Sequence, residues 1–487
     1  MKLYKSNDEY RVGEKPFKVT ACGNEIKVVS CDVSAYPFNQ VWQGKQRNKN
    51  QTELSYYVML GSNDPVNIEV EALFDFEEVV VRPLSKKVTT SVKENVVKAT
   101  FDGPGQYSIE FDGIHRSLAV FINPEKDFEK DTLGENLLYF GAGTHILDER
   151  IELCDNQTVF IDEGAVLYAS INATDKKNIR VIGYGILDNS RMQRADEING
   201  CAVLAKREVA ASGNPIFFNR CSNVIIDGVT IVDSSGWNVH LDGCDNVLID
   251  NIKIIGQWRY NADGCDFCNC TNAVIRNSFL RTFDDSIVVK GFKLNGSLPV
   301  QNILAENCVL WCDWGKALEV GVETCAPYMD TIVFKNCEII HGTTIMLDIQ
   351  QGDGSDVENV RFSNINIEYS GYEMKPVHQE REDGIYPLED SYGCPVPIAI
   401  SIGNSIWSTE NTTGNTKNVY FENINIISDK KDFPRGSEFL SENENSSIEG
   451  IFINNIMLNG RSCEFSEIGL DIGNKVNNVF YNDKKVK

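Results

Sequence analysis

The sequence predicts an all-β protein in which a β-sandwich precedes a parallel β-helix. Three observations predict this fold: a nine-residue phrase recurs from Asn178 onward, its aliphatic residues alternate, and the first 130 residues hold short strands without the phrase. At 487 residues the chain is too long for one ordinary core. We therefore expect a sandwich domain over residues 1–130 and a β-helix over residues 131–487.

The N-terminal part reads as a series of strands separated by Gly, Pro and Asn. Such dense, short, alternating segments are typical of an antiparallel β-sandwich of the immunoglobulin-like kind. The segment YFGAGTHIL at 139–147 then begins the β-helix with a Gly-rich turn. A domain in this place covers the open end of the β-helix and protects it from edge-to-edge association. The expected strands lie at 24–36, 55–61, 66–73, 78–84, 96–101, 106–113 and 117–124.

The recurring phrase begins with Asn, alternates aliphatic residues, and has Asn or Gly at its sixth position. Consecutive copies lie mostly 23–30 residues apart, which suits one coil of a parallel β-helix. Every second side chain points inward, and an Asn at the bend can bond backbone groups and its stacked copies. Leucine-rich repeats need several fixed Leu per unit, which these copies lack. The copies begin at residues 178, 223, 246, 272, 302, 331, 359, 418 and 450.

Two intervals between copies exceed one coil, from 178 to 223 and from 359 to 418. The second contains a stretch at 370–395 that is rich in turn formers and aromatic residues. Long loops on rigid scaffolds often build binding sites, so we expect this stretch to cover one face of the helix.

Composition and charge narrow the possible partners and location. The net charge of −24 disfavours nucleic acid and acidic polysaccharide as partners. No apolar run is long enough for a membrane span, and residues 1–18 lack the apolar run of a secretory signal. The 15 cysteines are odd in number and lie mostly in apolar contexts, which fits a reducing compartment. We expect a cytoplasmic protein.

The cysteines cluster densely only at Cys265, Cys268 and Cys270. A zinc site would need a fourth ligand and usually a second, separated pair. Because Cys221 and Cys244 occupy the same place in their phrases as Cys270, we interpret these residues as stacked core cysteines. We expect neither a metal nor a cofactor.

Two acidic phrases are the candidates for chemistry. One contains Asp263 and Asp266, and the other contains Asp284 and Asp285. Asp263 and Asp284 are 21 residues apart, close to one short coil, and neighbouring coils lie only ~4.8 Å apart. Crowded carboxylates raise at least one pKa, which provides the protonated and ionised pair that glycoside hydrolysis needs. The alternative is that these Asp residues cap turns, and Asp266 suits that role best.

At these phrases the sequence resembles the polygalacturonase-type glycoside hydrolases of family 28. The resemblance rests on NADGCD at 261–266, FDDSIVVKG at 283–291 and the surrounding coils, and it covers roughly residues 135–460. The sandwich and YFGAGTHIL look more like the dextranase and isopullulanase family, family 49 of the same clan. Both families imply inverting hydrolysis on a right-handed parallel β-helix. The resemblance makes Asp284 the general acid and lets Asp263 and Asp285 activate water, with acid and base ~6.5–9.5 Å apart.

Two departures from the family 28 pattern bear on the substrate. Lys316 stands where a Gly-His-Gly motif has its His, and Met346-Leu347-Asp348 stands where an Arg-Ile-Lys motif grips the substrate carboxylate. An Asp in that place repels a uronate, which Arg or Lys would bind. We therefore expect a neutral oligosaccharide, such as an isomalto- or pullulan-type α-glucan.

Further residues near these phrases are candidates for binding the sugar. Trp258 is the preferred stacking platform over Trp237, Trp311 and Trp314, although a Trp is more often part of a core. His240 could lie one coil from the aspartates or be a structural hydrogen bonder, and Lys316 could bind a hydroxyl or pair with Glu319. The full set is His240, Trp258, Arg259, Asn261, Asp266, Lys290, Lys316, Glu319, Glu323 and Asp348.

Other functions on the same scaffold stay open from the sequence. A galacturonide hydrolase, a uronate lyase or epimerase with a calcium site, and a non-catalytic glycan-binding β-helix are the alternatives. A lyase needs a basic cluster, for which only Arg259, Arg281 and Lys290 are at hand. A cytoplasmic enzyme would act on imported short oligosaccharides or glycosides, from one end. The sequence leaves the oligomeric state open.

Overall fold

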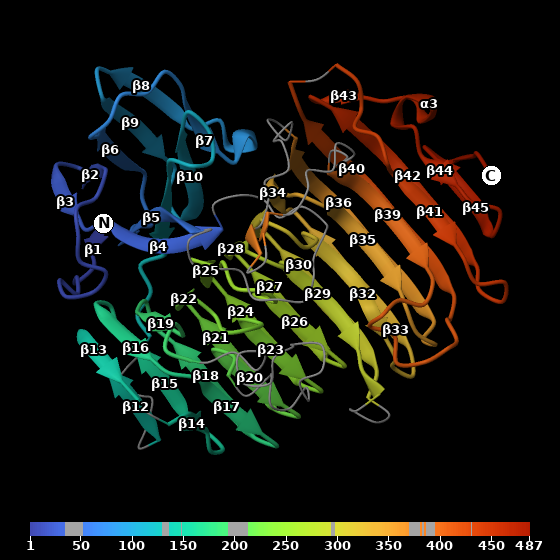
Figure 1. The fold of residues 1–487 in the computed structure, drawn as a ribbon, viewed down its shortest axis with the longest axis horizontal. Helices are drawn as coiled ribbons and strands as arrows, with labels where there is room; N and C mark the ends of the chain where they lie inside the picture. The colour runs from blue at the N-terminus through green and yellow to red at the C-terminus, as the bar shows by residue number, and fades with distance from the viewer. Residues whose placement is uncertain are drawn as a thin grey trace.

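The computed structural model describes residues 1–34, 52–128, 136–147, 149–192, 213–293, 298–369, 395–429 and 431–487, and the backbone of 380–381 and 384–385. Two strand systems make up the molecule (Figure 1). An N-terminal pair of sheets packs beside the first coils of a long parallel β-helix, whose coils lead to the C-terminus at the far end. The expected all-β fold, a parallel β-helix with an N-terminal sandwich, is confirmed.

The N-terminal sheets enclose a core of their own. Alternation along the strands places residues such as Val19, Val70 and Phe111 between the sheets, where they are buried. One sheet contains β1 (Lys2–Leu3), β4 (Val29–Ser34), β5 (Thr52–Gly61), β7 (Val79–Arg82), β10 (Gly105–Phe111) and β11 (Ser117–Asn123). The other contains β2 (Phe17–Ala21), β3 (Asn24–Ile26), β6 (Val66–Ala72), β8 (Thr89–Lys93) and β9 (Val96–Phe101), and a short 3-10 helix η2 spans Leu84–Lys86.

Two details of the sandwich differ from the expectation. The sheet is not wholly antiparallel, because β11 pairs with β5 in parallel, with Val120 opposite Val58. The strands β1, β2 and β8 were not predicted. β8 is exposed along its whole length, so it has no alternation of apolar and polar residues to reveal it.

The β-helix contributes one strand per coil to an 11-stranded sheet, which positions the candidate site. All its neighbours are parallel. In order along the sheet, the strands are β14 (Ile151–Glu152), β17 (Ile171–Thr174), β20 (Ile216–Asn219), β23 (Val239–Asp242), β26 (Cys265–Cys268), β29 (Ile287–Gly291), β32 (Leu318–Thr324), β35 (Ile345–Gln351), β39 (Val396–Ile402), β41 (Glu438–Ser441) and β44 (Asp471–Ile472).

A second sheet of 22 strands forms the remaining faces of the coils. Its strands up to the middle of the helix are β12 (Leu137–Phe140), β13 (Gly143–Ile146), β15 (Thr158–Ile161), β16 (Ala165–Tyr168), β18 (Lys177–Ile182), β19 (Ile186–Asp188), β21 (Ser222–Asp227), β22 (Thr230–Val232), β24 (Asp245–Asp250), β25 (Lys253–Ile255), β27 (Thr271–Arg276) and β28 (Phe279–Thr282). The rest are β30 (Val300–Glu306), β31 (Val309–Cys312), β33 (Met329–Lys335), β34 (Glu338–His341), β36 (Val357–Glu368), β40 (Thr416–Ile427), β42 (Ile448–Leu458), β43 (Arg461–Ser462), β45 (Val476–Tyr481) and β46 (Lys484–Lys485), with α3 at Phe465–Ile468.

The repeated Asn residues of the phrase form ladders along the helix. Asn at the sixth position adopts a left-handed conformation, as in Asn364 with φ of 54°, which Asn tolerates better than most residues. The Asn364 side chain donates to Asn336 at 3.1 Å and accepts from Asn423 at 2.8 Å. The Asn at the first position forms a second ladder, in which Asn223 donates to Asn178 at 2.9 Å.

The expected boundary near residue 130 lies in 129–135, outside the described residues, and it stays a prediction. The expected loop at 370–395 also lies outside them, apart from Pro395 and the backbone of β37 (Glu380–Arg381) and β38 (Gly384–Ile385). Among the helices that the structure describes, none has the length and apolar content of a membrane span.

Candidate active site

The outer face of the 11-stranded sheet carries most of the predicted site residues. His240 is flanked by Val239 and Leu241, which both point into the helix core, so alternation directs His240 outward. The same argument applies to Asp266, Glu319 and Asp348 on the strands that follow. Backbone pairing sets these residues in one row across the sheet, in the order His240, Asp266, Val288, Glu319 and Asp348.

Three aspartates meet where two neighbouring coils turn into β26 and β29. Asp263 precedes β26, and Asp284 and Asp285 precede β29. One carboxylate oxygen of each lies within 4.8 Å of those of the other two. The three residues are 2%, 8% and 7% exposed. The expected gathering of these carboxylates on one patch is therefore found.

Backbone pairing and a glycine explain why the patch is so tight. The N–H of Gly264 donates to the carbonyl of Asp285 at 2.7 Å, which stacks the two turns directly. Gly315 lies on the next coil, against the Asp284–Asp285 pair. A Cβ at Gly315 would lie 2.3 Å from the Asp285 nitrogen, so only glycine fits against the aspartate pair. This role of Gly315 was not predicted from the sequence, although the WGK phrase at 314–316 was its signal.

Lys290 lies between Asp263 and Asp266. Its Nζ lies 2.9 Å from Asp266 and 3.3 Å from Asp263, and it is 4.0 Å from the ring centroid of Trp237. The side chain is buried and its pKa is raised, since the attraction of these carboxylates outweighs the effect of burial. Lys290 thus offsets part of the charge that Asp263 and Asp266 would otherwise bury unpaired.

Lys316 is the cation next to Asp285. Its backbone N–H donates to Oδ1 of Asp285 at 2.9 Å, and its Nζ lies 3.8 Å from the same oxygen. The Nζ also pairs with Glu319 at 3.1 Å. The lysine therefore both contacts the aspartate patch and forms the plain ion pair that was its alternative role.

The surroundings push the pKa values of the three aspartates apart. Burial, together with the charges of Asp263 and Asp285, raises the pKa of Asp284 well above its usual value. Burial likewise raises the pKa of Asp263 to about 7, against the attraction of Lys290. For Asp285, burial is outweighed by Lys316 and Lys290 and by the hydrogen bond from the Lys316 N–H, so its pKa is lowered. These opposite shifts favour a protonated Asp284 beside an ionised Asp285.

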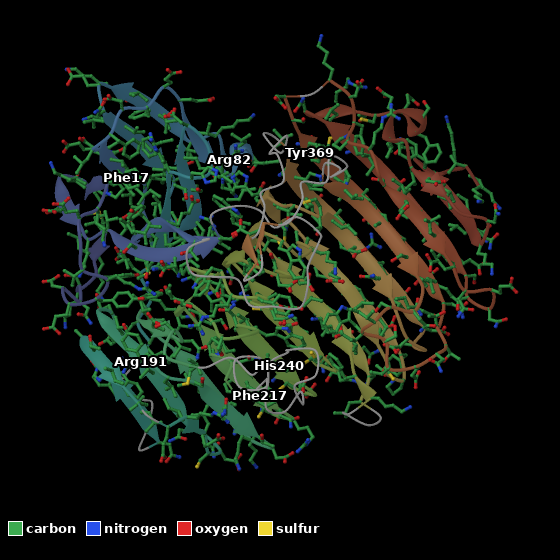
Figure 2. All side chains as sticks on the ribbon, in the orientation of Figure 1. Phe17, Arg82, Arg191, Phe217, His240 and Tyr369 are labelled. Atoms are coloured by element: carbon green, nitrogen blue, oxygen red, sulfur yellow. The ribbon has the colours of Figure 1, made fainter. Side chains whose placement is uncertain are left out.

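His240 lies beside the patch but is engaged in a network of its own. Its Nε2 is 3.0 Å from Asp242, and its Nδ1 is 3.3 Å from the Asn214 amide. The ring packs against Phe217 at 4.8 Å and Trp237 at 4.5 Å between centroids, and Phe217 and His240 lie close together in Figure 2. In the strand register, His240 lies opposite Asp266 rather than Asp263, and its side chain is buried.

Trp258 and Arg259 lie in a different place from the one expected. Trp258 is 8% exposed, and its indole N–H donates to Asp233 at 3.1 Å. Arg259 also approaches Asp233 at 3.1 Å and donates to the backbone of Ser190 and Met192. Asp233 therefore holds both side chains, which brace the loop before β26.

Three further residues, Asn261, Glu323 and Trp314, act on or border the aspartate patch. Asn261, half-buried with φ of 54°, shapes the turn before Asp263, and Glu323 adds negative charge that acts on Asp263 and Lys290. Trp314 is half-buried and packs on Phe283 at 5.7 Å, directly beside the aspartate pair.

Trp311 has a structural role, away from the aspartate patch. Its ring is 2% exposed in a cluster that joins the helix to the sandwich. Among the described residues, Trp237 and Trp314 are therefore better placed than Trp258 or Trp311 to meet a sugar.

The cysteine cluster is divided between the two faces of its strand. Cys265 and Cys270 lie in the helix core, as do Cys221 and Cys244, in agreement with the expected core stack. Cys268 faces outward, where its sulfur lies within 4.8 Å of ligand atoms of His240 and Asp242. The described cysteines form no disulfide.

A polar cavity of about 430 Å³ lies away from the aspartates. Gln106 and Tyr107 of the sandwich line it together with Asp227, Asp250 and Asn277 of the helix. Its acids are engaged, because Asp250 pairs with Arg276 at 2.9 Å and Asp227 pairs with Lys126. This cavity therefore lacks the paired acid and base of the aspartate patch.

Comparison with known proteins finds a similarity to a family of glycoside hydrolases. The model of "Glycosyl hydrolases family 28" matches residues 148–382. A search of the curated proteins gave no match.

Solved structures share the fold. Dex49A from Penicillium minioluteum is similar with a TM-score of 0.65 at 13% identity, covering 95% of this chain and 93% of that one. The Yersinia enterocolitica family 28 exopolygalacturonase is similar with a TM-score of 0.52 at 15% identity, covering 86% and 94%. The resemblance expected from the aspartate phrases and the sandwich is confirmed: the family model matches the coils that carry the aspartates, and Dex49A and the exopolygalacturonase share the fold.

Proposed function

We propose that this protein is an inverting glycoside hydrolase that acts on neutral oligosaccharides. The observation that carries the proposal is the divided pKa values of the aspartate patch, raised at Asp284 and lowered at Asp285 within one cluster of carboxylates. Hydrolysis of a glycosidic bond needs such a pair, one group to protonate the leaving oxygen and one to activate water.

The hydrogen bonds within the patch indicate which carboxylate oxygen donates a proton and which accepts one. The backbone N–H of Asp285 donates to Oδ1 of Asp284 at 3.0 Å, which leaves Oδ2 to carry the proton. Asp284 gives this proton to the glycosidic oxygen as the bond from the anomeric carbon breaks. Lys316 occupies Oδ1 of Asp285, so the other oxygen accepts a proton from the attacking water. Asp263, with a pKa of about 7, becomes a second acceptor when ionised.

The charges around the patch favour a neutral sugar. Lys290 is paired with Asp263 and Asp266, and Lys316 is paired with Asp285 and Glu319. Arg259 is held by Asp233. A uronate would need a cation that is not already paired, and Asp348 adds a further carboxyl group to the same face.

Hydrolysis assays with product analysis test this proposal. Purified protein is incubated with α- and β-linked neutral oligosaccharides and with oligogalacturonides, and the products are resolved by chromatography. We expect a neutral sugar to be released, and proton NMR of the first product to show the inverted anomer. Cleavage of galacturonides alone would contradict the neutral substrate, and a retained anomer would contradict inversion.

Asp284→Asn identifies the general acid. We expect the variant to lose about 10²- to 10⁴-fold in kcat, because a general acid contributes about that much. Glu358→Gln is the matched control, since Glu358 lies on β36 of the other sheet and pairs with Lys417 at 3.3 Å. Full activity of Asp284→Asn would exclude the assignment.

We also propose that the protein works in a reducing compartment. The described cysteines are free, and several of them stack in the helix core, where oxidation would disturb packing. Fractionation of the source cells tests this, with recovery in the cytoplasmic fraction as the expected result.

A further inference from the structure

Two acids that the proposed mechanism does not use stand side by side next to the aspartate patch. Glu319 on β32 and Asp348 on β35 are Cα partners in the parallel sheet. Leu347 and Ile349 point into the helix core, so Asp348 faces outward like Glu319. The two residues are 0% and 1% exposed, although each carries a carboxyl group.

Like Glu319, Asp348 has no side-chain hydrogen-bond partner at either carboxylate oxygen within the described part of the chain. Lys316 attracts it only from a distance, because the Lys316 ammonium is engaged by Glu319 at 3.1 Å and lies 3.8 Å from Asp285. A buried carboxyl group that has a backbone N–H beside it, that of Ile349, but no side-chain donor among the described residues is unfavourable for folding. Such a group persists most readily where a ligand supplies the donors.

We propose that Asp348, supported by Glu319, is a hydroxyl-binding subsite that selects a neutral sugar ring beside the scissile bond. This inference rests on the proposed function. The two oxygens of a carboxylate can each accept one hydrogen bond, and a neutral sugar ring presents adjacent hydroxyl donors. A uronate presents an acceptor and a negative charge to the same oxygens, which would repel it.

The nearby charges distinguish a neutral sugar from a cationic one. Lys316 already places an ammonium group among Asp285, Glu319 and Asp348. Burial raises the pKa of Glu319 against the attraction of Lys316. A second ammonium group, from an amino sugar, would face Lys316, whereas hydroxyl groups add no charge.

A subsite of this kind makes stability and binding respond in opposite directions to one substitution. Asp348→Asn keeps the shape of the side chain and removes the buried charge. We expect the melting temperature at pH 8 to rise. We expect binding of a neutral trisaccharide to weaken about tenfold, since a hydrogen bond to a charged acceptor is lost. A purely structural acid would lower the melting temperature and leave the selectivity between neutral and acidic sugars unchanged.

Binding is measured by calorimetry in the Asp284→Asn background, so that no sugar is turned over. The probes are isomaltotriose, maltotriose, a trisaccharide of glucosamine and trigalacturonic acid. Glu358→Gln serves as the control for the loss of one acid, and Glu319→Gln is the second variant if Asp348→Asn does not fold. We expect Asp348→Asn to weaken the neutral trisaccharide while leaving trigalacturonic acid no weaker, and Glu358→Gln to change neither by more than about twofold.

Each other outcome decides against the proposal. Unchanged neutral binding in Asp348→Asn and Glu319→Gln overturns the subsite while leaving the hydrolase intact. Tightest binding of the glucosamine trisaccharide overturns the selection of a neutral ring. If the wild type neither binds nor cleaves any neutral sugar, the proposed function fails and the subsite fails with it.

Discussion

At the scale of single residues, Asp285 depends on its neighbours for its charge. Burial alone would raise its pKa, as it does for Asp284, but Lys316, Lys290 and the hydrogen bond at its carboxylate lower it instead. The pKa values of two adjacent aspartates in one turn thus shift in opposite directions because their contacts differ.

Lys316→Met tests this dependence through the pH profile. Without the lysine the pKa of Asp285 rises, so the base is protonated over a wider acidic range. We expect the acidic limb of kcat/KM to move to higher pH by about one unit or more, because removal of a close opposite charge shifts a carboxyl pKa by about that much. Activity at pH 5 should fall more than activity at pH 7.

Lys335→Met is the control for this profile, since Lys335 pairs with Glu306 at 3.0 Å on the other sheet. An equal loss of activity at every pH in Lys316→Met would show that the lysine acts by a route other than the pKa of Asp285.

At the scale of elements, the bend of each coil rests on an Asn in a left-handed conformation. Asn364 combines this backbone with two ladder hydrogen bonds. We expect Asn364→Ala to lower the free energy of unfolding by about 2 kcal/mol, since it loses both the hydrogen bonds and the tolerance of positive φ. Asn364→Gly keeps that tolerance and should cost only about 1 kcal/mol. Denaturant unfolding measures both, and equal losses would mean that the conformation contributes nothing.

The sequence predicted the coils well because their signal is local and repeated. Asn223 and Asn246 mark the same place in consecutive coils, and the structure stacks them with a hydrogen bond of 2.7 Å. The spacing between Asp263 and Asp284 likewise predicted that their coils would be neighbours. Each of these inferences needed only the repeat length and the alternation of apolar residues.

The wrong placements have a common physical cause. Trp258 lies next to the aspartates in sequence, but its orientation depends on Asp233, a partner from the previous coil. The parallel pairing of β5 with β11 joins strands that are distant in sequence, so no local pattern reveals it. Side-chain direction in turns and long-range strand order are tertiary properties, which single-sequence patterns do not encode.

At the scale of the whole molecule, the sandwich and the β-helix share one apolar cluster. Tyr57 and Phe121 of the sandwich pack with Phe279 and Trp311 of the helix. Polar contacts close the same junction: Arg82 joins Glu110 of the sandwich to Glu368 of the helix, and the labels of Arg82 and Tyr369 in Figure 2 mark its two sides. Such a junction favours unfolding as one unit rather than as two independent domains.

A double-mutant cycle on Phe121 and Phe279 measures how strongly the two parts are joined, since their ring centroids are 5.1 Å apart across the junction. Each change to Ala should lower the free energy of unfolding by about 3 to 5 kcal/mol, because both rings are buried. The rings stabilise each other, so the double variant should lose less than the sum, with a coupling of about 1 kcal/mol.

Hydrogen exchange adds the test of cooperativity. In either single variant, peptides from β10 in the sandwich and from β42 in the helix should lose protection together, because the cluster that holds both parts is weakened at once. Loss of protection in β10 alone, with no coupling in the cycle, would mean that the sandwich unfolds without affecting the helix. The junction would then be a contact between separate domains, and the aspartate patch would keep its geometry without the sandwich.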